Sequence, residues 1–416
     1  MHISNKKILF VHQNFPGQFR HMASACVGKG YQVLAIGHHD NAYPKGVSYL
    51  RYPRPSSRAS GLHPWLGDVE TKFSRACAVR ELALQLKQQG FEPDAIVAHP
   101  GWGEALFLKE VWPRARLGLY AEFFYRAEGS DVGFDAEFAS LEKDSASRLM
   151  MKNTFNYLQF PLAEAYLSPT HWQANTYPTD WQSRMSVIHE GVNTDELAPA
   201  DARDIMLPNG KMLRPQAKVV TFVARNLEPY RGYHVFMRAL EKLQNMAPDT
   251  DILIIGGDAT SYGSAPPTGS TWKDKFWDEV KGQLRTDKIH FLGRLPYDKF
   301  LGVMQRSNVH VYLTYPFVLS WSLLEAMSLG KAIVASATAP VEEVMTHGRE
   351  GLLIPFFDTQ ALSQAIASLL NDPIQCSTLG NAARQRVLAS YDRQRQCLPQ
   401  QLAWIDKLIQ LPLRNP

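Results

Sequence analysis

KILFVHQ, residues 7–13, is a short apolar run with polar residues on both sides. It is followed by a turn that contains Gly17 and then by a helical pattern. This order predicts a strand, a loop and a helix. Similar apolar runs recur at helix-length intervals: YQVLAIG at 31–37, AIVAH at 95–99, LGLYAEF at 117–123, AYLSPT at 165–170 and SVIHEG at 186–191. Continuous apolar runs of this length are typical of parallel strands buried on both faces. The first half is therefore predicted to be a doubly wound α/β domain.

A second series of apolar runs follows in the other half of the chain. Its members are VVTFVAR at 219–225, DILIIGG at 251–257, KIHFLG at 288–293, VHVYLT at 309–314, KAIVAS at 331–336 and GLLIPFF at 351–357. The predicted fold class is α/β, with two doubly wound, parallel-sheet domains. If the two sheets face each other, their carboxyl ends surround one cleft, which is where open α/β sheets bind ligands.

The predicted domain boundaries follow from these runs. Residues 1–192 form the N-terminal domain and residues 218–390 the C-terminal domain. Residues 193–217 are polar, contain proline and show no sustained period, so they are predicted to be a linker. Residues 391–416 are expected to be a helical segment that returns toward the N-terminal domain.

Composition excludes several classes of protein. The 416 residues are 45% hydrophobic and 20% charged, which is ordinary for globular domains. The four cysteines form no CxxC pair, so a disulfide framework or cysteine zinc site is not indicated, and a reducing cytoplasm is expected. A net charge of +4 is too small for a dedicated nucleic-acid binder. The first apolar run is too short for a signal peptide, and no run suits a transmembrane helix.

The positive charge gathers in residues 51–90, which hold seven Lys or Arg against three acids. The same stretch contains GLHPWLG, with Leu62, Trp65 and Leu66 in a predicted loop. Basic surfaces with exposed aromatic residues suit an anionic membrane interface. We therefore expect this stretch to contact the inner face of a membrane; the alternative is a solvated loop and helix face.

Two segments contain groups that could bind phosphate. At Gly17 and Gln18 a glycine turn begins a helix, whose backbone N–H groups can face an anion, although a plain turn has the same pattern. Arg225 ends an apolar strand and Arg231 begins the next helix. Guanidinium groups bind phosphate oxygens in pairs, so these two arginines suit a diphosphate unless they are merely solvated.

Two further segments could contact a sugar or a ribose. Glu325 lies in an apolar helix after a hydroxyl-rich turn with Ser320, and a buried carboxylate there could accept hydrogen bonds from vicinal hydroxyls. The alternative is that the Glu325 side chain points to water. His99 ends a strand, where it can contact a sugar hydroxyl or serve as a structural histidine. No HxH or HExxH pattern is present, so no protein-bound metal is expected.

Taken in order, these segments resemble the retaining glycosyltransferases of family 4 (glycosyl transferases group 1), which have the GT-B fold of two facing Rossmann-like domains. The resemblance covers nearly the whole chain. Its motifs are the opening strand and glycine loop, the histidine, the Arg and Arg-Gly pair, HFLG at 290–293, YPFVLSWSLLEAMSLG at 315–330 and EEVMTHGREGLLIPFFD at 342–358.

The resemblance implies roles for residues of this sequence. His99, Arg225 and Arg231 would be catalytic, and the first domain would be the acceptor side. Donor binding would involve a larger set: Gly17, Gln18, Arg225, Arg231, Leu292, Leu319, Ser320 and Glu325. Two departures from the family pattern stand out, because Phe317 replaces a glutamate that usually meets donor sugar hydroxyls, and Arg231 replaces a lysine.

The implied activity is transfer of a sugar from a nucleoside-diphosphate-sugar to a hydroxyl of a lipid-linked or growing glycan, with retained configuration and without metal or cofactor. The departing phosphate would serve as the base, and the two arginines would stabilise its charge. Two alternatives are a sugar-nucleotide epimerase and a non-catalytic sugar-nucleotide binder. The sequence leaves the donor sugar, the acceptor and the oligomeric state open.

Overall fold

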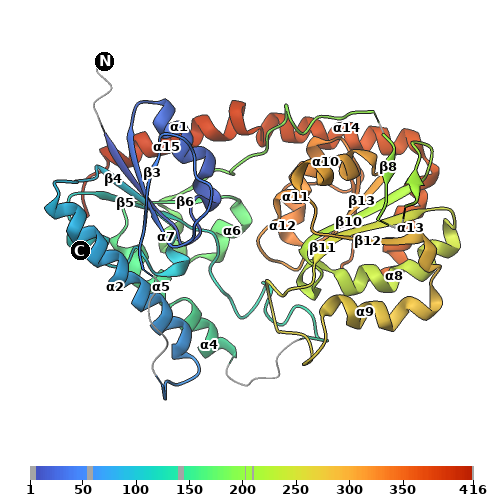
Figure 1. Cartoon of the computed structure of the whole chain (residues 1–416), viewed down its shortest axis with the longest axis horizontal. Coiled ribbons are helices and arrows are strands. Elements are labelled where there is room, and N and C mark those ends of the chain that lie inside the picture. The colour runs from blue at the N-terminus through green and yellow to red at the C-terminus, as the bar shows by residue number, and fades with distance from the viewer. Residues whose placement is uncertain (1–5, 54–59, 139–144, 202, 209, 415–416) are drawn as a thin grey trace. The chain divides into compact units, whose positions relative to one another are not determined.

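A computed structural model describes residues 6–53, 60–138, 145–201, 203–208 and 210–414 (Figure 1). The chain divides into two compact units. Unit 1 comprises Met1–Glu128, Ser140–Gly191 and Gln394–Pro416, and unit 2 comprises Gly129–Ala139 and Val192–Arg393. The expected linker, 193–217, thus lies within unit 2, and most of the C-terminal segment lies within unit 1.

Unit 1 is built on a seven-stranded sheet in the order β3-β2-β1-β4-β5-β6-β7, and every neighbouring pair is parallel. Its strands are β1 Lys7–Val11, β2 Gln32–Gly37, β3 Ser48–Arg51, β4 Ala95–Ala98, β5 Arg116–Tyr120, β6 Ala165–Ser168 and β7 Met185–Val187. The edge strand β3 was not predicted, because it is short and none of its residues is fully buried.

Helices cover both faces of this sheet, because alternate side chains of each strand point to opposite faces. Leu9 and Val11 of β1 join one core cluster, and Ile8 and Phe10 join the other, which includes Trp404 of α15. The helices are α1 Arg20–Gly28, α2 Leu66–Gln88, α3 Leu108–Val111, α4 Ser145–Lys152, α5 Thr154–Gln159, α6 His171–Thr176, α7 Thr179–Gln182 and α15 Leu398–Gln410, with short helical turns at Gly17–Phe19, Pro100–Trp102 and Phe160–Leu162.

Unit 2 has a six-stranded parallel sheet in the order β12-β11-β10-β13-β14-β15. Its strands are β10 Val219–Asn226, β11 Asp251–Gly257, β12 Ile289–Gly293, β13 Val309–Tyr312, β14 Ala332–Ser336 and β15 Leu352–Ile354. Its helices are α8 Tyr233–Met246, α9 Trp272–Val280, α10 Tyr297–Arg306, α11 Trp321–Ser328, α12 Ala339–Glu342, α13 Thr359–Asn371 and α14 Pro373–Ser390, with short turns at Pro229–Arg231, Lys281–Gln283 and Thr286–Lys288. A further short turn, Arg393–Cys397, begins at the last residue of unit 2 and continues into unit 1. The predicted α/β class with two parallel-sheet, Rossmann-like domains is confirmed.

The predicted linker contains a small antiparallel hairpin, β8 Ile205–Met206 with β9 Met212–Leu213. Leu207 and Leu213 are buried, and they pack with Val219 and Leu253 of the unit 2 sheet. This part of the chain therefore contributes to the core of unit 2. Among the described residues, no helix is both long enough and apolar enough to cross a membrane.

A second departure from a simple two-domain order is Gly129–Ala139, here called the inserted segment, which lies in the first half of the sequence but in unit 2. Phe134 stacks with Phe357 at a centroid distance of 5.2 Å, and Phe138 meets Trp272 edge-on at 5.2 Å. Tyr230 donates a hydrogen bond to Asp131 over 2.9 Å. Aromatic packing and a buried carboxylate therefore hold the segment against unit 2.

Candidate active site

At the carboxyl edge of the unit 1 sheet, His12 follows β1 and is 3% exposed. The backbone N–H of Asn14 donates to its Nδ1 over 2.9 Å, so Nε2 carries the proton and donates to Gln18 Oε1 over 2.9 Å. Burial, followed by the nearby His99, lowers the pKa of His12 to about 3. Gly17 has φ +43°, and a Cβ there would lie 2.7 Å from the His12 ring, so the turn requires glycine.

Glu122, directly after β5 and Ala121, connects this histidine loop to the predicted His99. Its Oε1 accepts from Gln18 over 2.7 Å, and its Oε2 lies 3.2 Å from His99 Nε2. His99 Nδ1 accepts from the backbone N–H of Gly101 over 3.1 Å, so its Nε2 is the donor. Burial acts to raise the pKa of Glu122, but the hydrogen bonds from His99 and Gln18 hold it below its usual range.

These groups form one continuous network, which we call the His12–His99 network: His12, Gln18, Glu122 and His99. Each donor meets an acceptor, so the orientation of every member is fixed. Gln18 uses its amide oxygen and one amide N–H within the network, and its donor-binding role stays a prediction. Glu122 was missed by the sequence analysis, although its place near the carboxyl end of the apolar run 117–123 was a usable signal.

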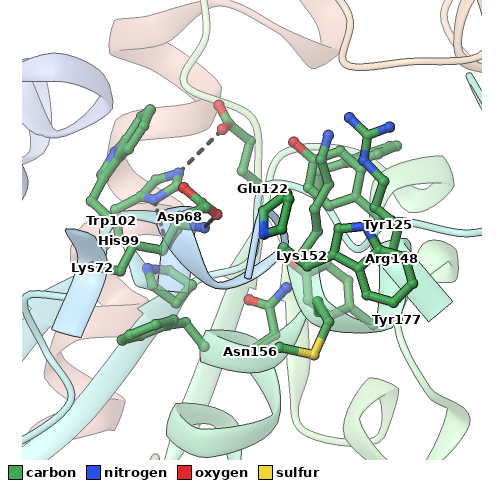
Figure 2. A pocket seen from close by; sticks show the side chains of 17 residues that line it. Asp68, Lys72, His99, Trp102, Glu122, Tyr125, Arg148, Lys152, Asn156 and Tyr177 are labelled. Atoms are coloured by element: carbon green, nitrogen blue, oxygen red, sulfur yellow. Dashed lines mark hydrogen bonds and ion pairs between the residues drawn. The ribbon is translucent and has the colours of Figure 1, made fainter. Parts of the chain in front are cut away.

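A cavity of about 390 Å³ lies beside this network (Figure 2). His99 and Glu122 form part of its wall, with Trp102 stacked on His99 at 5.9 Å. Its full lining is Pro64, Trp65, Asp68, Lys72, His99, Pro100, Gly101, Trp102, Glu122, Phe123, Tyr125, Arg148, Met151, Lys152, Phe155, Asn156 and Tyr177. Apolar and aromatic walls with a few polar groups are typical of small-molecule sites.

In unit 2, the two predicted arginines differ in their surroundings. Arg231 is 7% exposed and donates to Thr314 Oγ1 over 2.8 Å and to the Val318 carbonyl over 3.0 Å. Its guanidinium lies 5.2 Å from the Tyr262 ring centroid. Arg225, near the end of β10, is exposed, and its guanidinium makes no hydrogen bond or ion pair with another residue that the structure describes. One arginine is therefore fixed and the other is available to a ligand.

Glu228 lies between these arginines in sequence and is fully buried. Its Oε2 accepts from the backbone N–H groups of Ser261 and Tyr262 over 2.8 and 3.0 Å. Its Oε1 has no hydrogen-bond partner among the described residues. Burial raises the pKa of this carboxyl. Glu228 was not predicted from the sequence, because a single glutamate in a strand-to-helix turn gives no distinctive pattern.

Phe317, the residue that departs from the family pattern, is 6% exposed. Its ring packs at 90° against Tyr230, with centroids 5.5 Å apart, and lies 4.9 Å from the Tyr262 ring. Its ring also lies 6.0 Å from the Arg231 guanidinium. An aromatic cluster thus occupies this position and packs around the fixed arginine.

The remaining predicted residues lie around α11 and β12. Glu325 is half-buried on α11, accepts from the Tyr297 hydroxyl over 3.3 Å and has a pKa that burial raises. Ser320 caps α11 by accepting from the backbone N–H of Ser322, while its own N–H donates to Tyr312 over 2.9 Å. The side chains of Leu319 and Leu292 pack in or against the core, so each has only its backbone to offer a ligand.

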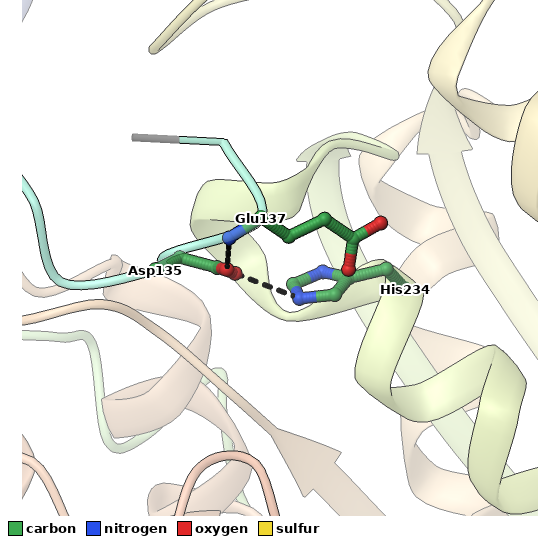
Figure 3. Close-up of side chains that lie close together, drawn as sticks. All are labelled: Asp135, Glu137 and His234. Carbon is green, nitrogen blue, oxygen red and sulfur yellow. Dashed lines mark hydrogen bonds and ion pairs between the residues drawn. The ribbon is translucent and has the colours of Figure 1, made fainter. Parts of the chain in front are cut away.

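A separate cluster of charged side chains connects the inserted segment to α8 (Figure 3). Asp135 Oδ2 lies 3.0 Å from His234 Nε2 and accepts from the Tyr315 hydroxyl over 2.6 Å. Glu137 accepts two hydrogen bonds from Arg238, over 2.6 and 2.9 Å. Asp135, Glu137 and His234 are near enough together to ligate a metal ion. Because Arg238 already neutralises Glu137, we interpret the cluster as a docking contact, and the expected metal independence stays a prediction.

Comparisons with known proteins agree with the sequence patterns. A family model described as the glycosyl transferase family 4 group matches residues 29–197, and one described as glycosyl transferases group 1 matches residues 209–386. D-inositol 3-phosphate glycosyltransferase of Mycobacteroides abscessus is 27% identical over 188 residues, which are 45% of this chain and 39% of that protein. The matched region therefore spans less than half the length of that curated relative.

Two solved structures resemble the chain over almost its entire length. Sucrose-phosphate synthase from Thermosynechococcus elongatus gives a TM-score of 0.71 at 18% identity, covering 97% of this chain and 99% of that one. Anabaena HepE in complex with UDP-glucose gives a TM-score of 0.65 at 16% identity, covering 96% and 99%. At such low identity the likeness establishes the fold.

Proposed function

Because the chain belongs to the family 4 glycosyltransferases whose models its two halves match, we propose that it transfers a sugar from a nucleoside-diphosphate-sugar to an acceptor hydroxyl. One observation carries the proposal: Arg225 and Arg231 flank the carboxyl end of β10, one exposed and one fixed. A pair of cations at that edge suits the diphosphate of such a donor.

The turn before α8 supports this arrangement. Gly232 has φ +67°, and a Cβ there would lie 2.3 Å from Leu313 Cβ. Only glycine therefore lets the turn after Arg231 lie so close to Leu313, which directly follows β13. In the proposed complex, Glu325 accepts from the ribose hydroxyls, and the backbone at Leu292 borders the base. The backbone N–H groups that begin with Leu319 and Ser320 contact the diphosphate.

The proposed reaction retains the anomeric configuration and needs no metal. Negative charge grows on the departing diphosphate, and the fixed Arg231 and the exposed Arg225 stabilise it more strongly in the transition state than in the ground state. The departing phosphate takes the proton of the acceptor hydroxyl. In the proposed complex a sugar hydroxyl replaces Glu122 Oε2 as the acceptor of the His99 Nε2–H hydrogen bond, and Gly17 offers its backbone N–H from the adjoining turn.

A panel of nucleotide-sugars tests the proposal. With candidate acceptors present, the expected result is release of a nucleoside diphosphate and a product whose anomeric proton coupling matches that of the donor. An epimerase would instead convert the donor to its epimer without releasing the nucleotide. Tight binding of a donor with neither outcome would indicate a non-catalytic binder, and would contradict the transferase proposal.

We also propose that the acceptor is a lipid-linked or growing glycan met at the inner face of a membrane. Leu62 and Leu66 are exposed, at 36% and 38%, and Phe73 on the same helix as Leu66 is 49% exposed. Part of the basic charge nearby is internally paired, since Arg80 binds Glu110 over 2.7 Å. Arg54 and Arg58, which belong to the basic stretch, lie outside the described residues.

Co-sedimentation with vesicles tests this second proposal. Binding should require anionic lipid, weaken with salt and fall when Arg54 and Arg58 become serine. A matched double variant in unit 2, Lys281→Ser with Arg285→Ser, removes the same charge from exposed positions and should bind normally. Equal recovery in the supernatant with and without anionic vesicles would reject the membrane contact.

A further inference from the structure

The buried Arg231 is held by two loops of unit 2. Its own loop, which follows β10, includes Tyr230, and the loop that follows β13 supplies Thr314, whose hydroxyl oxygen accepts from Arg231 Nη1 over 2.8 Å. Tyr315, directly after Thr314, donates its backbone N–H to the Tyr230 carbonyl over 3.0 Å. The ring centroids of the two tyrosines lie 4.7 Å apart. The position of Arg231 is therefore tied to the positions of Tyr230 and Tyr315.

Both of these tyrosine hydroxyls donate to the inserted segment. Tyr230 donates to Asp131 Oδ2 over 2.9 Å, and Tyr315 donates to Asp135 Oδ2 over 2.6 Å. The two aspartates are 4% and 5% exposed, and a hydrogen bond to a carboxylate is stronger at such a buried site than in water. The segment thus fixes the residue that precedes Arg231 and the residue that follows its partner Thr314.

The inserted segment is itself held in place, so it can support other groups. Asp135 Oδ2 lies 3.0 Å from His234 Nε2 of α8 (Figure 3). Glu137 accepts two hydrogen bonds from Arg238, which is on the same helix. Both ends of the segment continue along the chain into unit 1. A support for an arginine of unit 2 therefore comes from a stretch that lies within the sequence of unit 1.

We propose that the inserted segment positions the Arg231 guanidinium for the donor diphosphate, and that it does so through Tyr230 and Tyr315. This inference rests on the proposed transferase function, in which Arg231 binds that diphosphate. A cation stabilises a developing charge best when it is preorganised, and a misplacement of about 1 Å can cost roughly 100-fold in rate. Asp131 and Asp135 are positioning residues, because they act through the tyrosine hydroxyls and do not touch the donor.

Calorimetry with the full chain tests the proposal through binding. The probes are UDP, GDP and ADP and the matching monophosphates, and the base that binds most tightly is used for every variant. The measured quantity is the ratio of the monophosphate to the diphosphate dissociation constant, here called the diphosphate preference. Tyr230→Phe and Tyr315→Phe each keep the ring and remove one hydroxyl. Each should lower the diphosphate preference at least about 5-fold, the scale of one hydrogen bond.

Two combinations show whether this effect passes through the inserted segment and through Arg231. Asp131→Ala and Tyr230→Phe remove the same hydrogen bond, so the double variant should lower the diphosphate preference no more than either substitution alone. Arg231→Gln should itself remove most of the preference, and in that protein neither tyrosine substitution should lower it further. A purely structural role of the tyrosines would lower thermal stability and weaken both nucleotides equally.

The matched control is Tyr233→Phe. The Tyr233 side chain is fully buried in the same unit, and its hydroxyl donates to the Lys273 carbonyl over 3.3 Å instead of to the inserted segment. This variant should keep the parental diphosphate preference.

Two results would overturn the proposed positioning role. One is an unchanged diphosphate preference in both Tyr230→Phe and Tyr315→Phe. The other is a further loss of preference when these substitutions are added to Arg231→Gln. A different result would contradict the transferase proposal itself, and this inference with it: the parent protein would bind no nucleoside diphosphate and release none from any nucleotide-sugar.

Discussion

The carboxyl edges of the two sheets present their polar groups in different ways. At the edge of unit 1, His12 and His99 are connected through Gln18 and Glu122 by hydrogen bonds of 2.7 to 3.2 Å. At the edge of unit 2, the exposed Arg225 has no such partner among the described residues. The first arrangement is complete without a ligand, whereas the second has charge left for one. Substitutions should therefore affect stability more at the first edge and catalysis more at the second.

The largest effect is expected at Arg225. Arg225→Ala should lower transfer by at least about 100-fold, the scale of one lost preorganised donor to a developing charge. The melting temperature should stay unchanged, because Arg225 is exposed. Steady-state kinetics and thermal denaturation measure the two quantities. Arg285→Ala, at another exposed position of unit 2, is the matched control, and transfer within a few-fold of the parent would remove the proposed role of Arg225.

A smaller effect is expected at Glu325, on the same edge. Hydrogen bonds to a charged group contribute about 1.5–3 kcal/mol, so Glu325→Gln should weaken nucleoside diphosphate binding by roughly 10- to 100-fold. Because Tyr297 also donates to this carboxylate, Tyr297→Phe serves as the control that removes only the intramolecular bond. Unchanged affinity by calorimetry in Glu325→Gln would support the solvated-helix interpretation.

At unit 1, Glu122→Gln should lower stability. Both Glu122 oxygens accept hydrogen bonds, and an amide would place an N–H group opposite one of two donors. The cost is about 1–2 kcal/mol in unfolding free energy, the scale of one lost hydrogen bond at a partly exposed site. Urea denaturation measures it. An unchanged midpoint would show that the network does not contribute to stability, and the two sheet edges would then not differ in this respect.

The last prediction concerns the pH dependence of stability and His12, whose contribution is spread over several pH units. The folded pKa of about 3 lies below the ordinary 6.5, so between these values the unfolded chain binds a proton that the folded protein does not. Stability should therefore fall as pH falls from about 6.5 toward 3, by at most about 1.4 kcal/mol per pH unit from this group. His12→Gln should remove that slope and the exposed His63→Gln should not, as denaturation at several pH values would show. Parallel pH profiles for parent and His12→Gln would contradict it.

The apolar runs predicted the sheets well, because a parallel strand buried on both faces must be continuously apolar. Run 251–257 coincides with β11. The edge strand β3 and the hairpin in 193–217 were not predicted, because half-exposed strands and two-residue strands do not form continuous apolar runs.

For the site, sequence pattern singled out the arginines and His99 but could not reveal their partners. Glu122 and Gln18 are 104 residues apart in sequence, and only strand order β1-β4-β5 brings their loops together. The pairing of Asp135 with His234 depends on a chain crossing that leaves no periodic signal. Tertiary proximity of this kind follows from topology and not from local composition.

Because the inserted segment belongs to unit 2 but lies within the sequence of unit 1, the two units are interleaved along the chain. A fragment that begins at Val192 would lack a piece of its own fold. In this fragment His234 would lose its contact with Asp135. The rings of Phe356 and Phe357, which pack against Phe134, would become more exposed to solvent. Such a fragment would tend to aggregate. Swapping C-terminal halves between relatives to change donor choice would fail at the same place unless Gly129–Ala139 travelled with the half it belongs to.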